Sequence, residues 1–380
     1  MQQASVELVI EYEGEAGGRV GRLRTPHGEI PTPTFMPCAS WGTVRACTPT
    51  DVVSVGLGIM VCNAFHLSQR PGAERIAACG GLHRFIGWDG PLATDSGGFQ
   101  VLSLSSGESI SEDGVLIRSA VDGQLVMLTP EAAVSAQEKI GADISVALDI
   151  CPPYPISQEE ARGAVERTLR WAERCLAAHS RPDQSLWGVV QGGVFPELRR
   201  RSAQATAALG FEGFCIGGLS VGESRGEMLS ALSAALAALP KEPPRWLMGV
   251  GTPRDIVECA MLGVDLFDCV LPTRMARHGS IVTSRGVVKI GNARWGEVWE
   301  AVDPSCDCPM CTRYSAAYVH HLFRIGEAAA WRLLSLHNLR YYARLMTELR
   351  HAMQAGEAQE LLRALPQWTI RDTEEPSGLA

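Results

Sequence analysis

Carboxylates close three of the most apolar segments of this 380-residue chain. Asp95, Asp149 and Asp268 each end such a run, and Gln191 ends a fourth. In α/β proteins the carboxyl ends of strands carry the chemistry, whereas a single acid after a strand usually caps the next helix. Three acids and an amide in this position therefore predict one shared polar pocket.

Cysteines form a second pattern with chemical meaning. The candidate ligands are Cys306, Cys308, Cys311 and, 26 residues later, His337. Three thiolates and an imidazole complete a tetrahedral zinc shell without a position for water, so we expect one structural Zn²⁺ per chain. This metal would tie its loop to the start of the last helix. His320 and His321 compete as fourth ligand, and three chance surface cysteines are the plain alternative.

Repeated βα units must position these residues. Short apolar runs, each followed by a turn and a helical pattern, occupy 34–39, 59–65, 92–95, 144–150, 186–191, 213–219, 245–250 and 264–271. Runs that are apolar on both faces suit parallel strands covered by helices. Eight such units predict an α/β protein of the (β/α)8 TIM-barrel type. An open, doubly wound sheet is the alternative, because periodicity does not show closure.

Three segments interrupt this alternation. Residues 6–33 suggest an N-terminal hairpin, and 99–129 suggest a hairpin turning at Asp122-Gly123 after the third strand. The predicted organisation is 1–271 for the N-terminal hairpin and barrel strands, 272–337 for a zinc-binding insertion and 338–370 for closing helices. A long last helix is expected around 337–355, and the polar tail 371–380 is expected to be disordered.

Composition limits the cellular locations and the partners that the sequence predicts. No apolar stretch reaches the roughly 18 residues that span a membrane, and the first residues lack a secretory signal. Nine of the 12 cysteines are scattered, as reduced buried thiols are, which favours a cytoplasmic protein. The net charge is −8, yet 271–350 holds 11 Lys and Arg against 6 Asp and Glu. That segment could face phosphates, or it could be a solvated helical face.

Motifs along most of the chain carry a family resemblance. They are Gly21-Arg22-Leu23 through Phe35-Met36-Pro37, Asn63 to Pro71, Ala93-Thr94-Asp95-Ser96-Gly97-Gly98-Phe99-Gln100, Val189-Val190-Gln191-Gly192-Gly193, Gly217-Gly218-Leu219-Ser220-Val221-Gly222-Glu223, Leu247-Met248-Gly249-Val250-Gly251, Phe267 to Gly279 and the cysteine cluster. In this order they resemble the bacterial queuine tRNA-ribosyltransferases, or tRNA-guanine transglycosylases. The resemblance implies a TIM barrel with a zinc-bearing insertion.

The resemblance also implies a reaction. Family members exchange guanine at the tRNA wobble position for a 7-deazaguanine base in queuosine biosynthesis, by double displacement. Asp268 matches the nucleophile that forms a ribosyl-aspartate intermediate, and Asp95 matches the general acid/base. A neighbouring apolar strand is expected to raise the pKa of Asp95.

Further roles follow from the same resemblance. The base-binding set is Asp149, Gln191, Gly218, Leu219, Ser96, Phe99, Met248 and Asn63. The set for tRNA phosphates is Arg274, Arg277 and His278. Phe99 and Met248 would sandwich the base, although core packing is the plain alternative for both. The structural zinc is the only cofactor expected, and the reaction consumes no cofactor.

Two stretches depart from the family pattern. Asp149-Ile150-Cys151-Pro152-Pro153 stands for the usual Asp-Glu-Cys-Thr-Pro, and Cys62-Asn63-Ala64-Phe65-His66 for Gly-Asn-Thr-Tyr-His. Cys151 and Val221 resemble the bacterial type that takes 7-aminomethyl-7-deazaguanine, so we expect that base, with queuine as the alternative.

The sequence also bears on the oligomeric state and on two alternative functions. Tyr314, Tyr318 and His321 match positions that family members use in a homodimer, although an internal core stripe would show the same spacing. A metal-dependent barrel hydrolase would need ligands at the strand ends, where a His pair is lacking. A non-catalytic paralogue that binds tRNA or a partner subunit would have lost Asp268, which is present.

Overall fold

Eight parallel strands form the centre of the computed structural model, which describes residues 6–98, 110–119, 121 and 123–366. They are β4 (Thr34–Pro37), β5 (Met60–Asn63), β6 (Leu92–Asp95), β9 (Ile144–Val146), β10 (Ser185–Val190), β11 (Phe214–Ile216), β12 (Arg245–Leu247) and β13 (Leu266–Cys269). Each pairs with the next along the chain, and β13 pairs with β4. A bridge between Cys38 and Val61 joins β4 to β5, and the amide of Ala39 donates to the Val61 carbonyl at 2.7 Å. The predicted (β/α)8 barrel is therefore confirmed over the open sheet.

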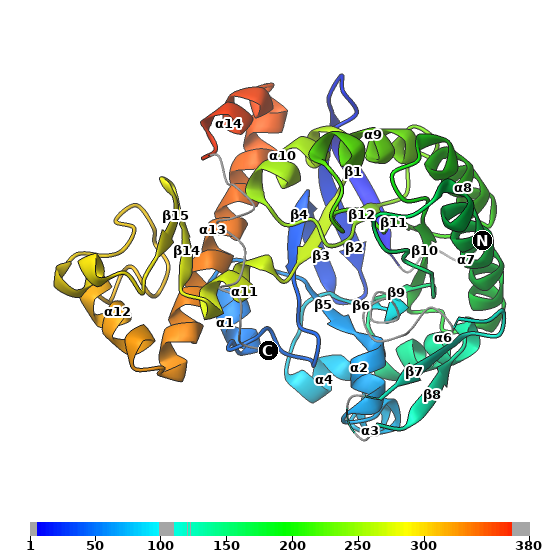
Figure 1. The fold of residues 1–380 in the computed structure, drawn as a ribbon, viewed down its shortest axis with the longest axis horizontal. Coiled ribbons are helices and arrows are strands. Elements are labelled where there is room, and N and C mark those ends of the chain that lie inside the picture. The colour runs from blue at the N-terminus through cyan, green and yellow to red at the C-terminus, as the bar shows by residue number, and fades with distance from the viewer. Residues whose placement is uncertain (1–5, 99–109, 120, 122, 367–380) are drawn as a thin grey trace.

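Helices surround the strands (Figure 1). They are α1 (Pro49–Ser54), α2 (Ala64–Gln69), α3 (Ala73–Ala78), α4 (Leu82–Ile86), α6 (Pro130–Ile140), α7 (Gln158–Ala178), α8 (Pro196–Ala208), α9 (Arg225–Leu236) and α10 (Pro253–Met261). Their starts follow the sequence signals. Thr129 caps α6 by accepting from the amide of Ala132, and Ser157 and Glu160 form a capping box at α7.

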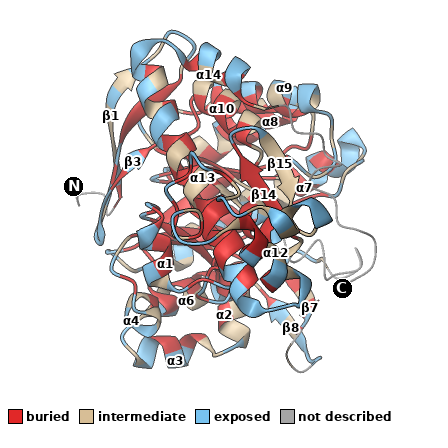
Figure 2. Ribbon diagram, turned by 90° about the vertical axis from the view of Figure 1, so that its left-hand side faces the viewer, coloured by how far each residue is buried: buried red, intermediate tan, exposed pale blue. Residues whose placement is uncertain are grey.

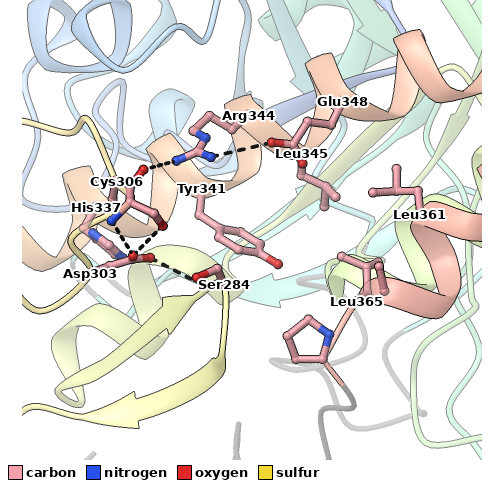
Figure 3. Close-up of a pocket in the computed structure, with 13 residues that line it drawn as sticks. Ser284, Asp303, Cys306, His337, Tyr341, Arg344, Leu345, Glu348, Leu361 and Leu365 are labelled. Atoms are coloured by element: carbon pink, nitrogen blue, oxygen red, sulfur yellow. Dashed lines mark hydrogen bonds and ion pairs between the residues drawn. The ribbon is translucent and has the colours of Figure 1, made fainter.

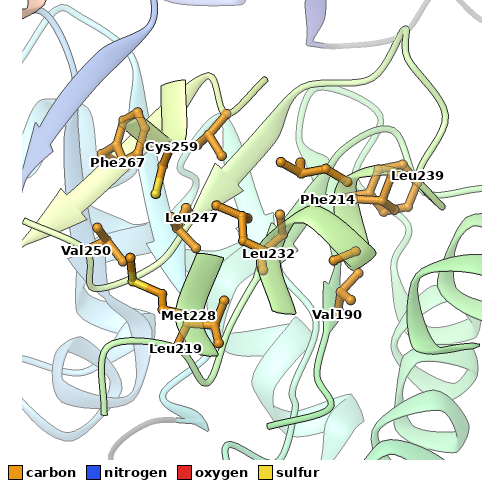
Figure 4. Packing of buried hydrophobic residues seen from close by; sticks show 14 of the residues in the cluster. Val190, Phe214, Leu219, Met228, Leu232, Leu239, Leu247, Val250, Cys259 and Phe267 are labelled. Atoms are coloured by element: carbon orange, nitrogen blue, oxygen red, sulfur yellow. The ribbon is translucent and has the colours of Figure 1, made fainter. Parts of the chain in front are cut away.

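Buried residues occupy the centre of the molecule (Figure 2), and the apolar ones form two layers. Inside the barrel, Met36, Trp187, Cys215 and Trp246 belong to one packed cluster. Between strands and helices, side chains such as Leu247 and Phe267 pack against helices α9 and α10 (Figure 4). Burial of each such side chain contributes about 1.5–3 kcal/mol, so the strand ends rest on a rigid base.

Two antiparallel units decorate the barrel. β1 (Glu7–Glu13), β2 (Arg19–Thr25) and β3 (Gly28–Thr32) form a three-stranded sheet, one strand more than the predicted hairpin, because β2 pairs on both edges. Buried Arg19 binds Asp265, next to the start of β13, so this sheet lies at the amino ends of the barrel strands. The predicted hairpin after β6 is present as β7 (Val115–Arg118) and β8 (Leu125–Leu128), although Asp122 at its turn lies outside the described residues.

The segment after β13 builds a separate lobe. It holds α11 (Leu271–Arg277), β14 (Ser280–Thr283), β15 (Gly286–Lys289), the 3-10 helix η2 (Ala293–Glu297) and α12 (Ala316–Arg324). The chain then returns along α13 (Ala328–Ala355) and α14 (Ala358–Ala364). The expectation that the last long helix begins near His337 was wrong. The helix begins at Ala328 because three alanines, which are strong helix formers, follow Glu327.

Some sequence expectations stay predictions. The boundary at 337 falls inside α13, so the proposed division of the chain does not coincide there with the end of an element. Phe99 and the tail 371–380 lie outside the described residues. Within the described part of the chain, no helix is long and apolar enough to cross a membrane.

Candidate active site

Four neighbouring strands of the ring bring the two expected catalytic acids to the same end of the barrel. Asp95 on β6 pairs in register with Asn63 on β5, whose Nδ2 donates to Asp95 Oδ1 at 2.6 Å. The closing bridge carries the ring on to β4 at Cys38, whose Sγ lies 3.6 Å from Oδ2 of Asp268 on β13. Asp95 and Asp268 are therefore linked by two intervening strands and their polar side chains.

The acids also share one electrostatic environment. The charges of Asp149, Asp268 and Asp95 all act with burial to raise the pKa of the Cys215 thiol well above its usual range. Cys215 lies on β11 inside the barrel. The three carboxylates therefore all lie near one central thiol at this end of the barrel, and the pocket that they would share stays a prediction.

The surroundings of Asp95 shift its pKa toward neutral pH. Burial raises the pKa of Asp95 to about 7; the hydrogen bond from Asn63 opposes the rise and the charge of Asp268 adds to it. The amide of Gly97 also donates to Asp95 Oδ1, at 3.2 Å. A carboxyl group in this state can both give and take a proton.

Asp268 likewise accepts two hydrogen bonds on one carboxylate oxygen. Its Oδ1 accepts from the indole Nε1 of Trp246 at 2.8 Å and from the amide of Gly249 at 3.1 Å. Burial raises the pKa of Asp268, while these two hydrogen bonds oppose the rise. Trp246 is fully buried on β12, and sequence reasoning missed it because a core tryptophan gives no sign of where its N–H points.

Asp149 and Gln191 form a buried hydrogen-bonded pair. Gln191 Nε2 donates to Asp149 Oδ2 at 2.7 Å, and burial raises the pKa of Asp149 to about 6 against this hydrogen bond. The Oε1 of Gln191 is buried and has no hydrogen-bond partner among the described residues. A buried acceptor without a donor fits an N–H group supplied by a ligand.

Glycines make room around this pair. A Cβ at Gly98 would come within 2.3 Å of Asp149 Oδ1, and a Cβ at Gly218 would come within 2.4 Å of Gln191 Oε1. Only glycine therefore permits the backbone to approach these polar side chains so closely.

Arg199 organises the same region and was not expected from the sequence. Its fully buried guanidinium donates to the carbonyls of Gly193 at 2.8 Å, Val190 at 2.9 Å, Gly217 at 2.7 Å and Gly218 at 3.0 Å. Burial lowers the pKa of Arg199 to about 10, which leaves the group cationic at neutral pH. Nothing in the sequence distinguishes Arg199 from its neighbours Arg200 and Arg201.

The other expected base-site residues lie close to these loops. Ser96 and Leu219 are buried, and Met248 packs against the barrel interior. The expected phosphate-binding residues follow Asp268 directly, with Arg274 and Arg277 on α11 and His278 at its end. Arg274 is exposed, whereas Arg277 and His278 are half-buried.

The four predicted metal ligands lie together in the inserted lobe. Nδ1 of His337 lies 3.4 Å from Cys308 Sγ and 3.2 Å from Cys311 Sγ, and Cys306 belongs to the same group. His337 Nε2 donates to the Val282 carbonyl at 2.8 Å, which leaves Nδ1 as the ligand atom. These spacings suit tetrahedral Zn²⁺. The competitor His320 instead contacts the Ile290 carbonyl, at 2.6 Å.

A cavity of about 220 Å³ lies beside this cluster (Figure 3). Its lining includes Ser284 and Asp303 of the insertion, Tyr341 and Arg344 on α13, and Leu361 on α14. None of the strand-end acids lines it, so it is separate from the polar region of the barrel.

A second group that could hold a metal lies at the opposite end of the barrel. Asp143, just before β9, lies 2.7 Å from Nδ1 of His27 and 3.2 Å from Nε2 of His83. The two imidazole rings are stacked, with centroids 3.5 Å apart and planes 13° apart. A metal lies in the plane of a ligating imidazole, so these nearly parallel rings do not share one ion in this arrangement.

Known proteins resemble the chain over nearly its whole length. A family model described as Queuine tRNA-ribosyltransferase matches residues 14–367. Proteins named queuine tRNA-ribosyltransferase are 47% identical in Moorella thermoacetica, over 93% of this chain and 95% of that relative, and 48% identical in Thermus thermophilus, over 93% and 92%. The relative from Granulibacter bethesdensis is 46% identical, over 98% of this chain and all of its own length.

Proposed function

The chain belongs to the queuine tRNA-ribosyltransferase family, and from this premise we propose the reaction that it catalyses. It exchanges guanine at the wobble position of a tRNA anticodon for a 7-deazaguanine base, through a covalent ribosyl-aspartate. The observation that carries this proposal is that Asp95 and Asp268 lie at the same end of the barrel, separated only by β5 and β4. Asp95 accepts a hydrogen bond from Asn63, whereas Asp268 accepts from Trp246 and contacts Cys38.

Asp268 is the nucleophile. A lone pair of its carboxylate forms a bond to ribose C1′ while the C1′–N9 bond breaks, and the bond's electrons leave with guanine. The donors Trp246 and Gly249 oppose the effect of burial on the pKa of Asp268 and so favour the ionised form that attacks. The phosphodiester chain is not cut, because only the bond from sugar to base changes.

Asp95 is the general acid and general base. It protonates the departing guanine and then accepts a proton from the incoming base, whose N9 attacks C1′ and returns the bonding electrons to Asp268. A pKa of about 7 makes both directions accessible at neutral pH.

Recognition of the flat base falls to the pair formed by Asp149 and Gln191. Asp149 Oδ1 and Gln191 Oε1 would accept N–H groups from the base edge, and the backbone of Gly218 and Leu219 would complete the contact. Asn63, Ser96, Phe99 and Met248 stay proposed members of the same site, and Phe99 lies outside the described residues.

The incoming base is proposed to be 7-aminomethyl-7-deazaguanine. Cys151, one of the two residues that resemble the type taking this base, is buried beside Asp149, as is Ile150. Competition between the aminomethyl base and queuine would test this choice. Faster incorporation of queuine would overturn it.

The remaining assignments concern the surroundings of the site. Arg274, Arg277 and His278 would hold tRNA phosphates, since they follow Asp268 directly. Cys306, Cys308, Cys311 and His337 would hold a structural Zn²⁺ that stabilises the insertion. We place the protein in the cytoplasm, where free thiols such as the nine cysteines outside the metal group persist. We also propose a homodimer through the inserted lobe.

Incorporation of labelled guanine into tRNA tests the reaction. The wild-type protein should incorporate label and form an RNA adduct that survives denaturing electrophoresis. Asp268→Asn should do neither, while its urea-unfolding midpoint stays close to that of the wild type. Full incorporation by Asp268→Asn would overturn the proposal.

A further inference from the structure

The two carboxylate oxygens of Asp268 have very different partners. Oδ1 accepts two N–H groups, from Trp246 at 2.8 Å and from Gly249 at 3.1 Å. Oδ2 faces the Cys38 thiol at 3.6 Å. A thiol is a weak donor, so Oδ2 keeps most of its electron density available.

Strand register places Cys38 at this oxygen. Asp268 pairs with Met36, and Cys38 lies two residues further along the same chain, so both side chains point to the same face of β4. That face lies inside the barrel, where Met36 is buried and Cys38 packs against the same cluster. The thiol is therefore held by the barrel wall and not by a mobile loop.

We propose that Asp268 attacks ribose through Oδ2, and that Cys38 is a positioning residue that orients this oxygen by a weak S–H donation. This inference rests on the proposed function. Under this inference Oδ1 holds the carboxylate in place through its two N–H donors. Oδ2, which lacks such donors, is the oxygen that reacts.

The strength of the donor matters for the step. As the bond from Oδ2 to C1′ forms, the C1′–N9 bond breaks, and its electron pair leaves on guanine, which takes its proton from Asp95. A strong O–H donor would stabilise the free carboxylate and resist this loss of charge on Oδ2. Without any donor, Oδ2 would be less fixed and Asp268 would hold its proton more tightly.

The thiol stays protonated in this setting. Burial and the charges of Asp268, Cys269 and Asp95 raise the pKa of Cys38 well above its usual range. Cys38 therefore donates a hydrogen bond and does not compete as a nucleophile. The titratable groups around Asp268 are Cys38, Asp95, Cys215 and Cys269.

Two substitutions at Cys38 separate orientation from mere packing. Cys38→Ala removes the donor, and we expect the acid limb of kcat/KM to move up by about 0.5–1 pH unit. Cys38→Ser supplies a stronger donor, and we expect adduct formation in a single turnover to slow roughly three- to tenfold, with the acid limb moved down. KM for tRNA should change little in either variant.

Cys269→Ala is the matched control. Cys269 lies next to Asp268 on β13, but its thiol accepts from the Leu271 amide at 3.4 Å and packs in the outer layer. This variant should keep the wild-type pH profile and single-turnover rate. A crystal structure of the trapped adduct should show the ester on the oxygen facing Cys38, with the other still bound to Trp246.

The outcomes separate the role of Cys38 from that of Asp268. Wild-type profiles in both Cys38 variants, or an ester on the oxygen facing Trp246, would overturn this inference while leaving the nucleophile in place. Retained incorporation by Asp268→Asn would instead remove the proposed function itself.

Discussion

Two aspartates with the same side chain receive different environments at the carboxyl ends of β6 and β13. Asp95 accepts from one side-chain amide and one backbone amide, and burial sets its pKa at about 7. Asp268 is anchored by an indole and a backbone amide on one oxygen. These surroundings suit the proposed roles of Asp95 as proton carrier and of Asp268 as nucleophile, without any change of residue type.

Asp95 gives the pH dependence expected of the reaction. Its carboxyl group is protonated below a pKa of about 7 and ionised above it. Because guanine needs a proton to leave, kcat/KM for tRNA in labelled-guanine exchange should fall about tenfold per pH unit on the alkaline side. Asp95→Asn should lose at least roughly 100-fold in kcat/KM. An Asn variant with wild-type rate and slope would contradict this role.

The acids could be recognised from the sequence, whereas several of their partners could not. Asp95, Asp149 and Asp268 end apolar runs, and the barrel brings such ends together. The contact from Trp246 to Asp268 depends on the orientation of an indole across two strands. The four carbonyls bound by Arg199 meet only after two loops have folded, so no local pattern marks that arginine.

At the scale of elements, buried charge ties the N-terminal sheet to the barrel. Burial raises the pKa of Asp143, but hydrogen bonds from His83, His27 and the Leu92 amide hold it below its usual value. A carboxylate with a lowered folded pKa stabilises the protein above its unfolded pKa, and this stabilisation is lost as the pH falls through the folded value.

Asp143→Asn should therefore destabilise the protein in a pH-dependent way. We expect the free energy of unfolding at pH 7 to fall by about 1–3 kcal/mol, because the amide group replaces a charged acceptor. The difference from the wild type should shrink below about pH 4. Urea unfolding at pH 7, 5 and 3.5 measures it, and an equal loss at all three values would argue against the ionic contribution.

In the inserted lobe, the proposed stabilising interaction is the binding of zinc. Cys308→Ser should lower the zinc content by about one ion per chain and destabilise the lobe by at least roughly 2 kcal/mol. Metal analysis and limited proteolysis between 272 and 336 measure these changes. Cys79→Ser, a half-buried free thiol of the barrel, is the control and should keep its zinc. Unchanged zinc in Cys308→Ser would refute the ligand set.

At the scale of the whole molecule, the inserted lobe stands apart from the barrel (Figure 1). It carries exposed aromatic side chains. Tyr314 and Tyr318 stack with centroids 5.4 Å apart and are 37% and 45% exposed. Trp299, in the loop after η2, and Trp331, near the start of α13, are also exposed. An internal core stripe would have been covered, so this surface suits contact with a second chain.

Replacing Tyr314 and Tyr318 with arginine should weaken the proposed dimer. We expect the dissociation constant to rise at least roughly 30-fold, since two aromatic anchors would be replaced by charge. Light scattering after size exclusion should show about twice the mass of one chain for the wild type and a shift toward one chain for the variant. Phe85→Arg, an exposed aromatic position on α4, is the control. A wild-type protein that is monomeric at all concentrations would exclude the dimer.

The order of the strands could be predicted from the sequence, whereas the closure of the barrel could not. Eight apolar runs with helical segments between them predicted the strands in the right order. Periodicity reports burial and not pairing, so the bridge between Cys38 and Val61 that turns a sheet into a barrel had no local signal. The start of α13 was misplaced because the alanines at 328–330 are neutral in an amphipathic pattern but favour helix strongly.

The close approach at Gly98 and Gly218 sets a limit on how the pocket tolerates change. Even the smallest added carbon would collide with Asp149 or Gln191. A saturation library should therefore reject every replacement at these two positions, including alanine, regardless of polarity or charge. The space that the chain leaves empty at Gly98 and Gly218 thus decides where the side chains of Asp149 and Gln191 can lie.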